Sequence, residues 1–448
     1  MASKTPLKPD YHDVHSQNAG VGPDMDLFKA STLYFFYPLA GPGGRLAVHP
    51  IAAKGRLPTH IPGLVCGSGI TDYALDPFDP ARVFVACEDS AVRVWSVPSD
   101  LSADMDACAK TLSDSSMDKV TLLRPHPTAS DLLLTVSNDR GDPSLRVWDV
   151  TKGNVVLKRS VGGGITSAAW SPEGKLLALA TRSKSVIVLD LREETSRVAP
   201  AHDSVRPARL EWVSDECFIS TGFTRSASRE LILYRVGAEV AVVAKQTLDV
   251  SPAPLFPHAD LDTNVLFLHS RGERTVLAIE VQPNDAAPFT NLPPFSDGAL
   301  QSGLAYLPKR HNDIAGVEIV RALRLTPSAV QVVSFSIPRA KADFFQDDVF
   351  PPTRDVEAPA LTAEAWFRGE NAESRRISLQ PNGMQPLSQA PVEAPKASTR
   401  SQIADGPVMT DSQKQDAFYD RLFDAAKDDS SEESDYDNRG TAPDDDDW

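Results

Sequence analysis

One stretch of the sequence decides the fold, and it reads Val83-Phe84-Val85-Ala86-Cys87-Glu88-Asp89-Ser90-Ala91-Val92-Arg93-Val94-Trp95. Its first part is apolar and rich in β-branched and aromatic side chains, which is the composition of a buried strand. A short polar turn at residues 88–90 follows, and the residues after it alternate apolar Val and Trp with the polar Arg93. Alternation with a period of two places the apolar side chains on one face of a strand. The stretch therefore predicts a β-hairpin.

The same pattern returns further along the chain. It recurs in residues 132–136 with 145–149, and again in residues 176–180 with 186–190. From about Ser31 to Arg339, short apolar or β-branched runs alternate with turn clusters, and no sustained helical period interrupts them. This pattern predicts an all-β body.

A repeat becomes visible when the position of Trp95 is marked in each hairpin. Successive marks are 41 to 56 residues apart, and they fall on Val48, Trp95, Trp148, Leu189, Tyr234, Ile279 and Phe335. A period of roughly 40 to 45 residues, with a strand that ends in Trp-Asp, resembles the blades of WD-repeat propellers, and longer intervals need only loop insertions. Seven marks predict a seven-bladed WD-repeat β-propeller.

The propeller prediction sets expectations for the core and for ring closure. The tryptophans of the repeats are expected to pack in the core, and these are Trp95, Trp148, Trp170 and Trp212. A propeller must also pair its first and last sheets so that neither leaves an exposed edge. An N-terminal strand drawn from residues 7–26 is expected to join the last blade.

Acidic residues are concentrated near the C-terminal end. The chain carries a formal net charge of −16, of which residues 416–448 contribute −10 through 13 acidic and 3 basic side chains, leaving −6 for the rest. This distribution disfavours nucleic acid as a partner. It predicts instead that the tail binds a basic protein surface, with an affinity that falls as salt rises.

Cysteine usage and hydropathy indicate the cytosol. The cysteines Cys66, Cys87, Cys108 and Cys217 form no closely spaced pair, so buried thiols in a reducing compartment are expected. The N-terminus lacks the apolar segment of a signal peptide, and the most apolar early run, residues 33–40, is too short to span a bilayer. We expect a cytoplasmic protein with no transmembrane segment and at most peripheral contact with membranes.

The chain after the last predicted blade resembles the coronin family. The resemblance rests on residues 337–351, which contain Phe345-Gln346-Asp347-Asp348, and on residues 361–369 around Trp366-Phe367. Further coronin-like segments are residues 202–207, 220–223 and 303–310. The resemblance covers roughly residues 30–390, and it implies a propeller with a C-terminal extension packed on it.

Within that family, the chain is most similar to the second propeller and tail of the long tandem-propeller coronins. Residues 55–58, 76–80 and 387–391 carry this likeness. Those relatives end in an acidic segment with a Trp, and no sustained heptads follow Pro391 here, so a monomer without a coiled coil is expected. The predicted domains are an N-terminal segment with the ring-closing strand (1–29), the propeller (30–340), the coronin-type extension (341–390), a flexible linker (391–411), and an amphipathic helix with a disordered acidic tail (412–448).

The tail combines an amphipathic helix with a terminal Trp. A helix over residues 412–427 would place Phe418, Leu422 and Phe423 on one stripe. A run of carboxylates, Asp444, Asp445, Asp446 and Asp447, then precedes Trp448, whose ring is suited to a partner's pocket. A helix followed by an acidic segment with Trp resembles the regions that bind the actin-related-protein (Arp) nucleation complex. The alternative is a solubilising tail with an accidental helix.

Serines within the acidic tail are candidate phosphorylation sites. They are Ser430, Ser431 and Ser434. A phosphate there adds negative charge, which we expect to strengthen binding to a basic surface.

The resemblance implies an actin-cytoskeleton regulator whose propeller binds actin filaments or other partners and whose tail binds the Arp nucleation complex. It also implies a cytoplasmic, cytoskeleton-associated location, with at most peripheral contact with vesicles or the Golgi. Short coronins use a basic, Arg-containing N-terminal region against filaments, whereas no Arg precedes Arg45 in this chain. The alternative is a Golgi or endosomal vesicle-trafficking scaffold, or a ubiquitin-ligase adaptor, without direct actin binding.

No enzyme, cofactor or metal site is expected from the sequence. No Cys/His cluster has metal-ligand spacing, and no Gly-rich phosphate loop follows a strand and opens a helix. The acidic pair Asp347-Asp348 and His202 are candidates for acid–base chemistry, and a simpler structural role is expected for each.

Overall fold

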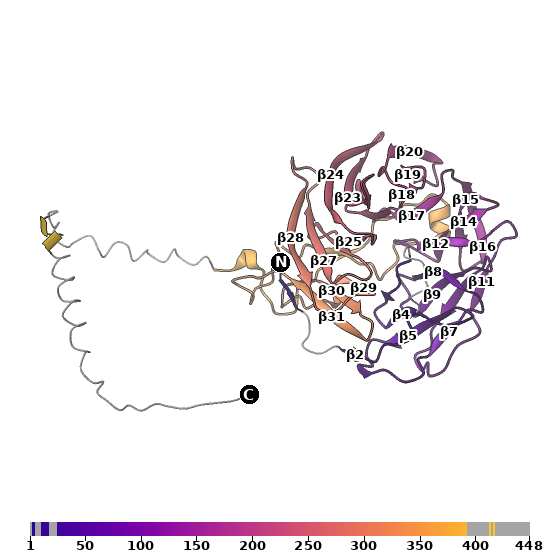
Figure 1. Ribbon diagram of the computed structural model, residues 1–448, viewed down its shortest axis with the longest axis horizontal. Coiled ribbons are helices and arrows are strands. Elements are labelled where there is room, and N and C mark those ends of the chain that lie inside the picture. The colour runs from indigo at the N-terminus through magenta and orange to yellow at the C-terminus, as the bar shows by residue number, and fades with distance from the viewer. Residues whose placement is uncertain (1, 5–9, 18–24, 392–411, 414, 417–448) are drawn as a thin grey trace, which may run out of the picture. The chain divides into compact units, whose positions relative to one another are not determined.

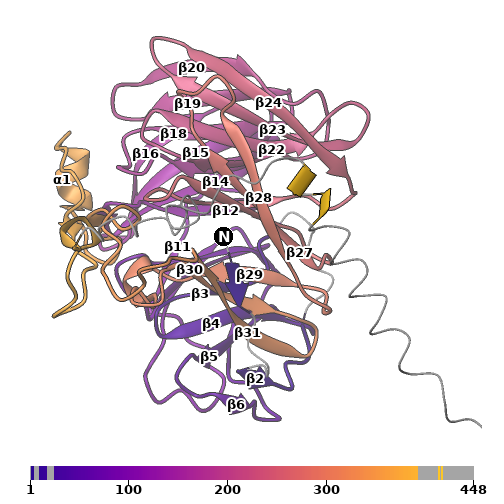
Figure 2. The same ribbon diagram turned by 90° about the vertical axis from the view of Figure 1, so that its left-hand side faces the viewer.

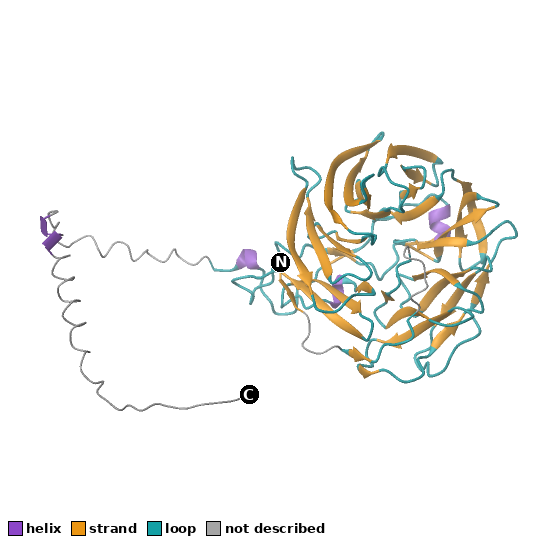
Figure 3. Cartoon of the chain, in the orientation of Figure 1, coloured by secondary structure: helices purple, strands orange, loops and turns teal. Residues whose placement is uncertain are grey.

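Seven β-sheets form a ring around a central axis in the computed structural model, which describes residues 2–4, 10–17, 25–391, 412–413 and 415–416 (Figure 1). Contacts within the chain divide it into Met1–Ala390 and Pro391–Trp448, and the ring belongs to the first unit. Strands and turns make up nearly all of this unit, and its few helices are short (Figure 3). The ring follows from the sequence because short, turn-bounded β runs can only bury their faces against neighbouring sheets.

Each blade is an antiparallel sheet whose strands run outward from the axis in chain order. Blade 1 contains β3 (Lys29–Ala30), β4 (Tyr34–Leu39), β5 (Arg45–Pro50) and β7 (Gly63–Val65); blade 2 contains β8 (Ile70–Leu75), β9 (Arg82–Cys87), β10 (Val92–Ser96) and β11 (Lys110–Leu112); blade 3 contains β12 (Val120–Pro125), β14 (Leu132–Asp139), β15 (Asp142–Asp149) and β16 (Asn154–Ser160). Blade 4 contains β17 (Ile165–Trp170), β18 (Leu177–Thr181), β19 (Ser185–Asp190) and β20 (Thr195–Pro200); blade 5 contains β21 (Arg209–Trp212), β22 (Cys217–Phe223), β23 (Ser228–Val236) and β24 (Val240–Val250). Blade 6 contains β25 (Phe256–Asp260), β26 (Val265–His269), β27 (Thr275–Val281) and β28 (Phe289–Ser296); blade 7 contains β29 (Gly303–Tyr306), β30 (Glu318–Leu325) and β31 (Ala329–Ser336).

The seven-bladed prediction is confirmed, including its register. Every marked position lies on the third strand of its blade, in the order Val48, Trp95, Trp148, Leu189, Tyr234, Ile279 and Phe335. The opening stretch forms the hairpin of β9 and β10, where Trp95 faces Val83 across the two strands. The period therefore reports a fixed place in the blade, whether that place holds a Trp or another large apolar residue.

N-terminal strands close the ring at blade 7. Strand β1 (Ala2–Lys4) and strand β2 (Tyr11–His12) both pair antiparallel with β31, and β2 also pairs in parallel with β6 (Gly55–Arg56). The chain's start and the propeller's last strands thus share one sheet, which leaves no unpaired edge on β31. Strand β1 lies before the range 7–26 that the sequence indicated for this strand.

Tryptophans of the blades lie in the core, as predicted. Trp95 and Trp148 are 1% and 0% exposed, and Trp170 and Trp212 are also buried. Their indole N–H groups find acceptors in several cases: Trp148 Nε1 donates to Thr135 Oγ1 at 3.0 Å, and Trp212 Nε1 donates to the Ala169 carbonyl at 3.0 Å. These rings stabilise the blades by burying large apolar surfaces.

Buried polar groups join strands within and between blades. Arg146 has no exposed side-chain surface and pairs with Asp114 at 2.8 Å and with Asp139 at 2.6 Å. His202 lies buried between Glu230, 2.9 Å from its Nδ1, and Ser220, 3.0 Å from its Nε2. The imidazole of His202 therefore has a structural role.

Candidate functional site

The central channel of the propeller contains a cavity of about 1180 Å³. Its wall is formed by the innermost strands of the blades, which carry charged or polar residues at the points that face the axis. Those residues include Lys29 on β3, Asp72 on β8, Arg124 on β12, Glu211 on β21, His258 on β25 and Tyr306 on β29.

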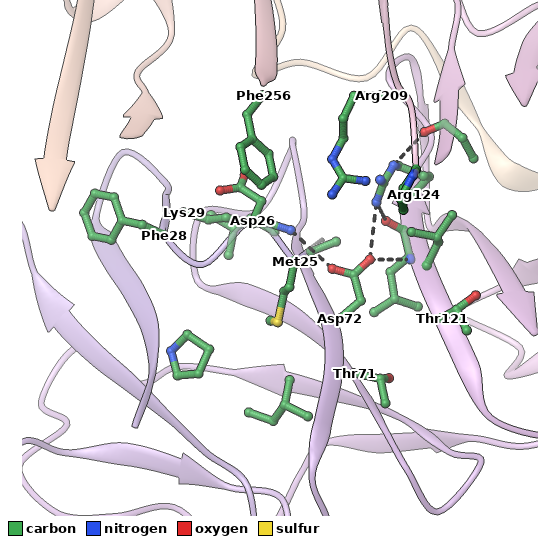
Figure 4. A pocket seen from close by; sticks show the side chains of 18 of the residues that line it. Met25, Asp26, Phe28, Lys29, Thr71, Asp72, Thr121, Arg124, Arg209 and Phe256 are labelled. Atoms are coloured by element: carbon green, nitrogen blue, oxygen red, sulfur yellow. Dashed lines mark hydrogen bonds and ion pairs between the residues drawn. The ribbon is translucent and has the colours of Figure 1, made fainter. Parts of the chain in front are cut away.

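Asp72 is the centre of a hydrogen-bonded cluster in this wall (Figure 4). Its carboxylate accepts the Leu123 backbone N–H at 2.9 Å and lies 3.3 Å from Arg124 Nη1 on one side and 3.6 Å from Lys29 Nζ on the other. Arg124 also donates through Nε to the Ala168 carbonyl at 2.7 Å. The cluster therefore links blades 1, 2, 3 and 4. Its charged side chains resemble those of a binding site, but they form ion pairs and hydrogen bonds with one another.

Three further titratable groups in the wall are shifted toward their neutral forms. Burial raises the pKa of Glu211 to about 7, and burial lowers the pKa of His258 to about 4 and that of His269 to about 3. His258 stacks on Tyr306 with ring centroids 3.8 Å apart. The described part of the channel wall thus combines these buried groups with the ion pairs of Asp72, an arrangement that stabilises the propeller. In the part of the chain that the structure describes, no group of three or more His, Cys, Asp or Glu residues could hold a metal ion.

A C-terminal extension, residues 338–390, crosses one face of the propeller (Figure 2). Its first part anchors under blades 6 and 7, where Phe345, Val349 and Phe350 join a buried cluster with residues of β26, β27, β30 and β31. The 3₁₀ helix η2 (Leu387–Gln389) returns to this point, because Leu387 N–H donates to the Phe345 carbonyl at 2.7 Å. Both ends of the extension are therefore held at one place.

Asp347 and Asp348 both make polar contacts within this anchor. Asp347 Oδ1 accepts the Ser388 backbone N–H at 3.1 Å, and Asp348 pairs with Arg339 at 2.6 Å. Asp347 thus ties the two ends of the extension together, whereas the Asp348 ion pair lies within its first part, and both carboxylates have the structural role expected from the sequence.

The middle of the extension anchors under blades 3 and 4. Strand β33 (Leu361–Thr362) pairs in parallel with β13 (Ala129–Ser130), and helix α1 (Ala363–Phe367) begins directly after it, with Thr362 Oγ1 accepting the Ala365 N–H at 3.2 Å as the N-cap. The helix lowers Trp366 into a buried cluster, where its side chain is 2% exposed. Trp366 belongs to residues 361–369, which carry part of the family resemblance, and its large ring fills this cluster.

Trp366 contacts the propeller through aromatic and cationic groups. Its ring meets Trp170 edge-on with centroids 6.3 Å apart and His126 with centroids 5.5 Å apart, and the Arg192 guanidinium lies 5.1 Å above it. Arg192 also donates to the Glu370 carbonyl at 3.0 Å and to Asn371 Oδ1 at 2.7 Å. One arginine of the propeller therefore fixes both the ring and the chain that follows it.

A single turn residue of blade 4 makes a further clamp. Glu173 lies 3.2 Å from Arg354 Nε of strand β32 (Thr353–Arg354), and its other oxygen accepts the Ser374 N–H and Oγ–H at 2.9 and 2.8 Å. Sequence reasoning missed this residue, because a Glu in a surface turn carries no signal of a partner 201 residues away.

Acid should weaken the Trp366 anchor through His126. This ring is 1% exposed, and burial lowers its pKa from 6.5 to about 4. Below pH 6.5 the unfolded chain binds a proton at His126 that the folded chain does not bind until about pH 4. The contribution of His126 to the free energy of unfolding should therefore fall between pH 6.5 and 4, by about 1.4 kcal/mol per pH unit. Denaturant titrations of the wild type and of His126→Gln should diverge with this slope, and parallel curves would contradict the assignment.

The tail residues singled out in the sequence lie outside the described residues. This applies to Phe418, Leu422, Phe423, Ser430, Ser431, Ser434, Asp444, Asp445, Asp446, Asp447 and Trp448. Of the predicted helix over residues 412–427, the structure describes 412–413 and 415–416, which are helical. The docking role of the tail stays a prediction.

The ring and its docked extension define the class: a WD40-type seven-bladed propeller. A model of a type of WD40 repeat matches residues 330–374, which span β31 and much of the extension. The crystal structure of the WD40 domain from Toxoplasma gondii coronin superposes with a TM-score of 0.76 at 26% identity, covering 85% of this chain and 97% of that one. A mitotic checkpoint complex structure, at 11% identity and a TM-score of 0.54, is similar in fold alone.

Sequence relatives identify the family. Coronin-2A of Bos taurus is 30% identical over 363 residues, which cover 78% of this chain and 67% of that protein. Coronin-7 of Homo sapiens is 36% identical over 432 residues, 94% of this chain and 46% of that protein. The chain belongs to the coronin family, whose members are actin regulators and non-enzymatic WD40 scaffolds. It spans less than half the length of the Coronin-7 proteins that it matches. No described helix is long and apolar enough to cross a membrane.

Proposed function

We propose that this protein regulates the actin cytoskeleton in the cytoplasm, with the propeller as a platform for actin filaments and the acidic tail as the binding segment for the Arp nucleation complex. The observation that carries the proposal is the extension, which docks under blades 3, 4, 6 and 7 around Phe350 and Trp366. The chain's membership in a family of actin regulators supports the same function. This extension holds distant blades together, as a platform for a large partner requires.

The charge distribution supports the division of roles. Residues 416–448 carry a net charge of −10 out of −16, so the tail alone can be attracted strongly to a basic surface, while residues 1–415 share the remaining −6. A tail with an aromatic residue at its end offers both charge and one large apolar group, a combination that gives both fast association and a specific contact.

Co-sedimentation with actin filaments tests the proposal. The full chain and a chain ending at Pro391 should both pellet with filaments, because the platform is present in each. Only the full chain should also retain the Arp complex, and that retention should fall as salt rises from 50 to about 300 mM. If neither form pelleted and the full chain retained no Arp complex, the proposal would be wrong.

A second candidate function is a Golgi or endosomal trafficking scaffold, or a ubiquitin-ligase adaptor, without direct actin binding. The observation that favours it is the lack of any Arg before Arg45, since only Lys4, Lys8 and Lys29 supply positive charge in that region. A chain that recruits coat or ligase components from lysate but fails to pellet with filaments would favour this function.

A further inference from the structure

A second, smaller cavity of about 450 Å³ lies where the extension meets blade 7. The propeller contributes η1 (Lys309–His311), the 3₁₀ helix between β29 and β30, and the extension contributes strand β34 (Arg376–Ile377) with the residues beside it. The lining consists of Arg310, Asp355, Arg375, Arg376, Ile377, Ser378 and Leu379. The cavity is therefore shared between two parts of the molecule that are distant in sequence.

The lining is strongly basic in a protein that is acidic overall. Three arginines face one aspartate, a formal charge of +2, whereas the whole chain carries −16. Arg375 and Arg376 are exposed, and neither forms an ion pair with any residue that the structure describes. Among the described residues, the ion pair of Arg310 is a long contact of 3.8 Å with Glu357. Guanidinium groups gathered in this way are suited to an anion with several oxygen acceptors.

Ser378 is the hydroxyl of this cavity, and it is accessible. Its side chain is exposed, and Ser378 Oγ accepts only the Gln380 backbone N–H at 3.2 Å among the described residues. Strand β34 pairs with β32 at two positions, Thr353 with Ile377 and Arg354 with Arg376, and within the described chain no strand pairs with its other edge. So short a pairing separates at low cost, which lets the segment enter a cleft as an extended peptide.

The sequence before Ser378 presents two successive arginines, Arg375 and Arg376, at the third and second positions upstream. Kinases choose substrates largely by charge pattern, and a kinase with an acidic substrate cleft reads such a basic pair on the N-terminal side of the hydroxyl. Ser374, one residue before the pair, is buried and donates to Glu173, so it cannot serve as the acceptor in its place.

We propose that Ser378 is phosphorylated by an arginine-directed protein kinase and that Arg310, Arg375 and Arg376 then hold the phosphate. In this step Ser378 Oγ attacks the γ-phosphorus of ATP, the new O–P bond forms as the bond to the β–γ bridging oxygen breaks, ADP leaves, and the kinase's base takes the hydroxyl proton. The phosphate brings about two negative charges into a cavity with a surplus of positive charge. Modification should therefore fasten β34 to the propeller through Arg310.

Phosphorylation of the full-length folded protein is the first test. The catalytic subunit of cAMP-dependent protein kinase with Mg²⁺ and ATP should add one phosphate, located at Ser378 by peptide mass mapping, and Ser378→Ala should abolish it. Arg376→Ala should slow the reaction by about tenfold, the loss of one charge-assisted contact in the kinase cleft. If urea-unfolded protein were modified at Ser378 while the folded protein was not, the site would be hidden and the proposal wrong.

Hydrogen exchange separates the phosphate cage from kinase recognition. Phosphorylated protein should exchange more slowly at residues 353–355 and 376–379 than unmodified protein. Arg310→Ala should remove this protection and leave the rate of phosphorylation unchanged, since Arg310 lies far from Ser378 in sequence and outside the segment that a kinase reads. Exchange that stayed equal or became faster on phosphorylation would overturn the role of the three arginines.

Discussion

Replacing Trp366 by alanine is expected to lower the free energy of unfolding by about 3–5 kcal/mol. The ring is 2% exposed and lies in a cluster built by blades 3 and 4 together with helix α1. Its removal deletes the contacts with His126 and Trp170 and leaves a cavity that the surrounding β-sheets cannot collapse to fill. It also leaves Arg192 without the ring it covers.

Guanidinium chloride titration, followed by tryptophan fluorescence and by circular dichroism, measures this loss. Trp366→Phe should recover part of the stability, because a smaller ring still fills most of the site. Val205→Ala, at a side chain that is 78% exposed, should change stability by less than about 0.5 kcal/mol. A loss below about 1 kcal/mol for Trp366→Ala would show that the extension is an accessory to the ring and not a clamp on it.

The two optical probes also distinguish how the variant fails. If the extension detaches before the ring unfolds, fluorescence should change at a lower denaturant concentration than circular dichroism, since the ring supplies nearly all of the β-structure. Coincident transitions would mean that extension and ring unfold together. The Glu173 clamp on Arg354 and Ser374 favours the second outcome, because it holds the chain on both sides of α1.

The repeat could be predicted from sequence because every blade solves the same local problem. A third strand needs a large apolar residue at one place, so Ile279 and Leu189 occupy the position of Trp95 and keep its period. Turn clusters set the strand ends, and alternation sets the faces. None of this depends on residues outside the blade, which is why the period survives where the Trp-Asp signature is lost.

Contacts across the ring could not be predicted in the same way. Asp72 and Arg124 are 52 residues apart, and Glu173 and Ser374 are 201 apart, so their pairing exists only once the blades have closed. The N-terminal strand illustrates the same limit. Closure of the ring requires an added strand in blade 7. Strand β1 supplies one, but it is a short polar segment, and no local sequence pattern indicates that it pairs with β31. The charged residues of the channel illustrate this limit too. Their residue types are those of a binding site, but their contacts in the structure join neighbouring blades.

Replacing Trp448 by alanine is expected to weaken capture of the Arp complex by about 30-fold, the effect of losing one aromatic anchor worth roughly 2 kcal/mol. The substitution leaves the formal charge of the tail unchanged. Electrostatic attraction alone would therefore be retained, and any loss reports a pocket for the ring. Surface plasmon resonance with immobilised Arp complex and the full-length chain measures the dissociation constant directly.

A second variant that removes charge but keeps the Trp448 ring separates the contribution of charge from that of the ring. Replacing Asp444, Asp445, Asp446 and Asp447 by asparagine keeps Trp448 and removes four carboxylates. This variant should bind more slowly and show a weaker salt dependence, whereas Trp448→Ala should dissociate faster with its salt dependence intact. If Trp448→Ala bound as tightly as the wild type while the asparagine variant did not, the tail would act through charge alone, and its terminal ring would have no pocket to fill.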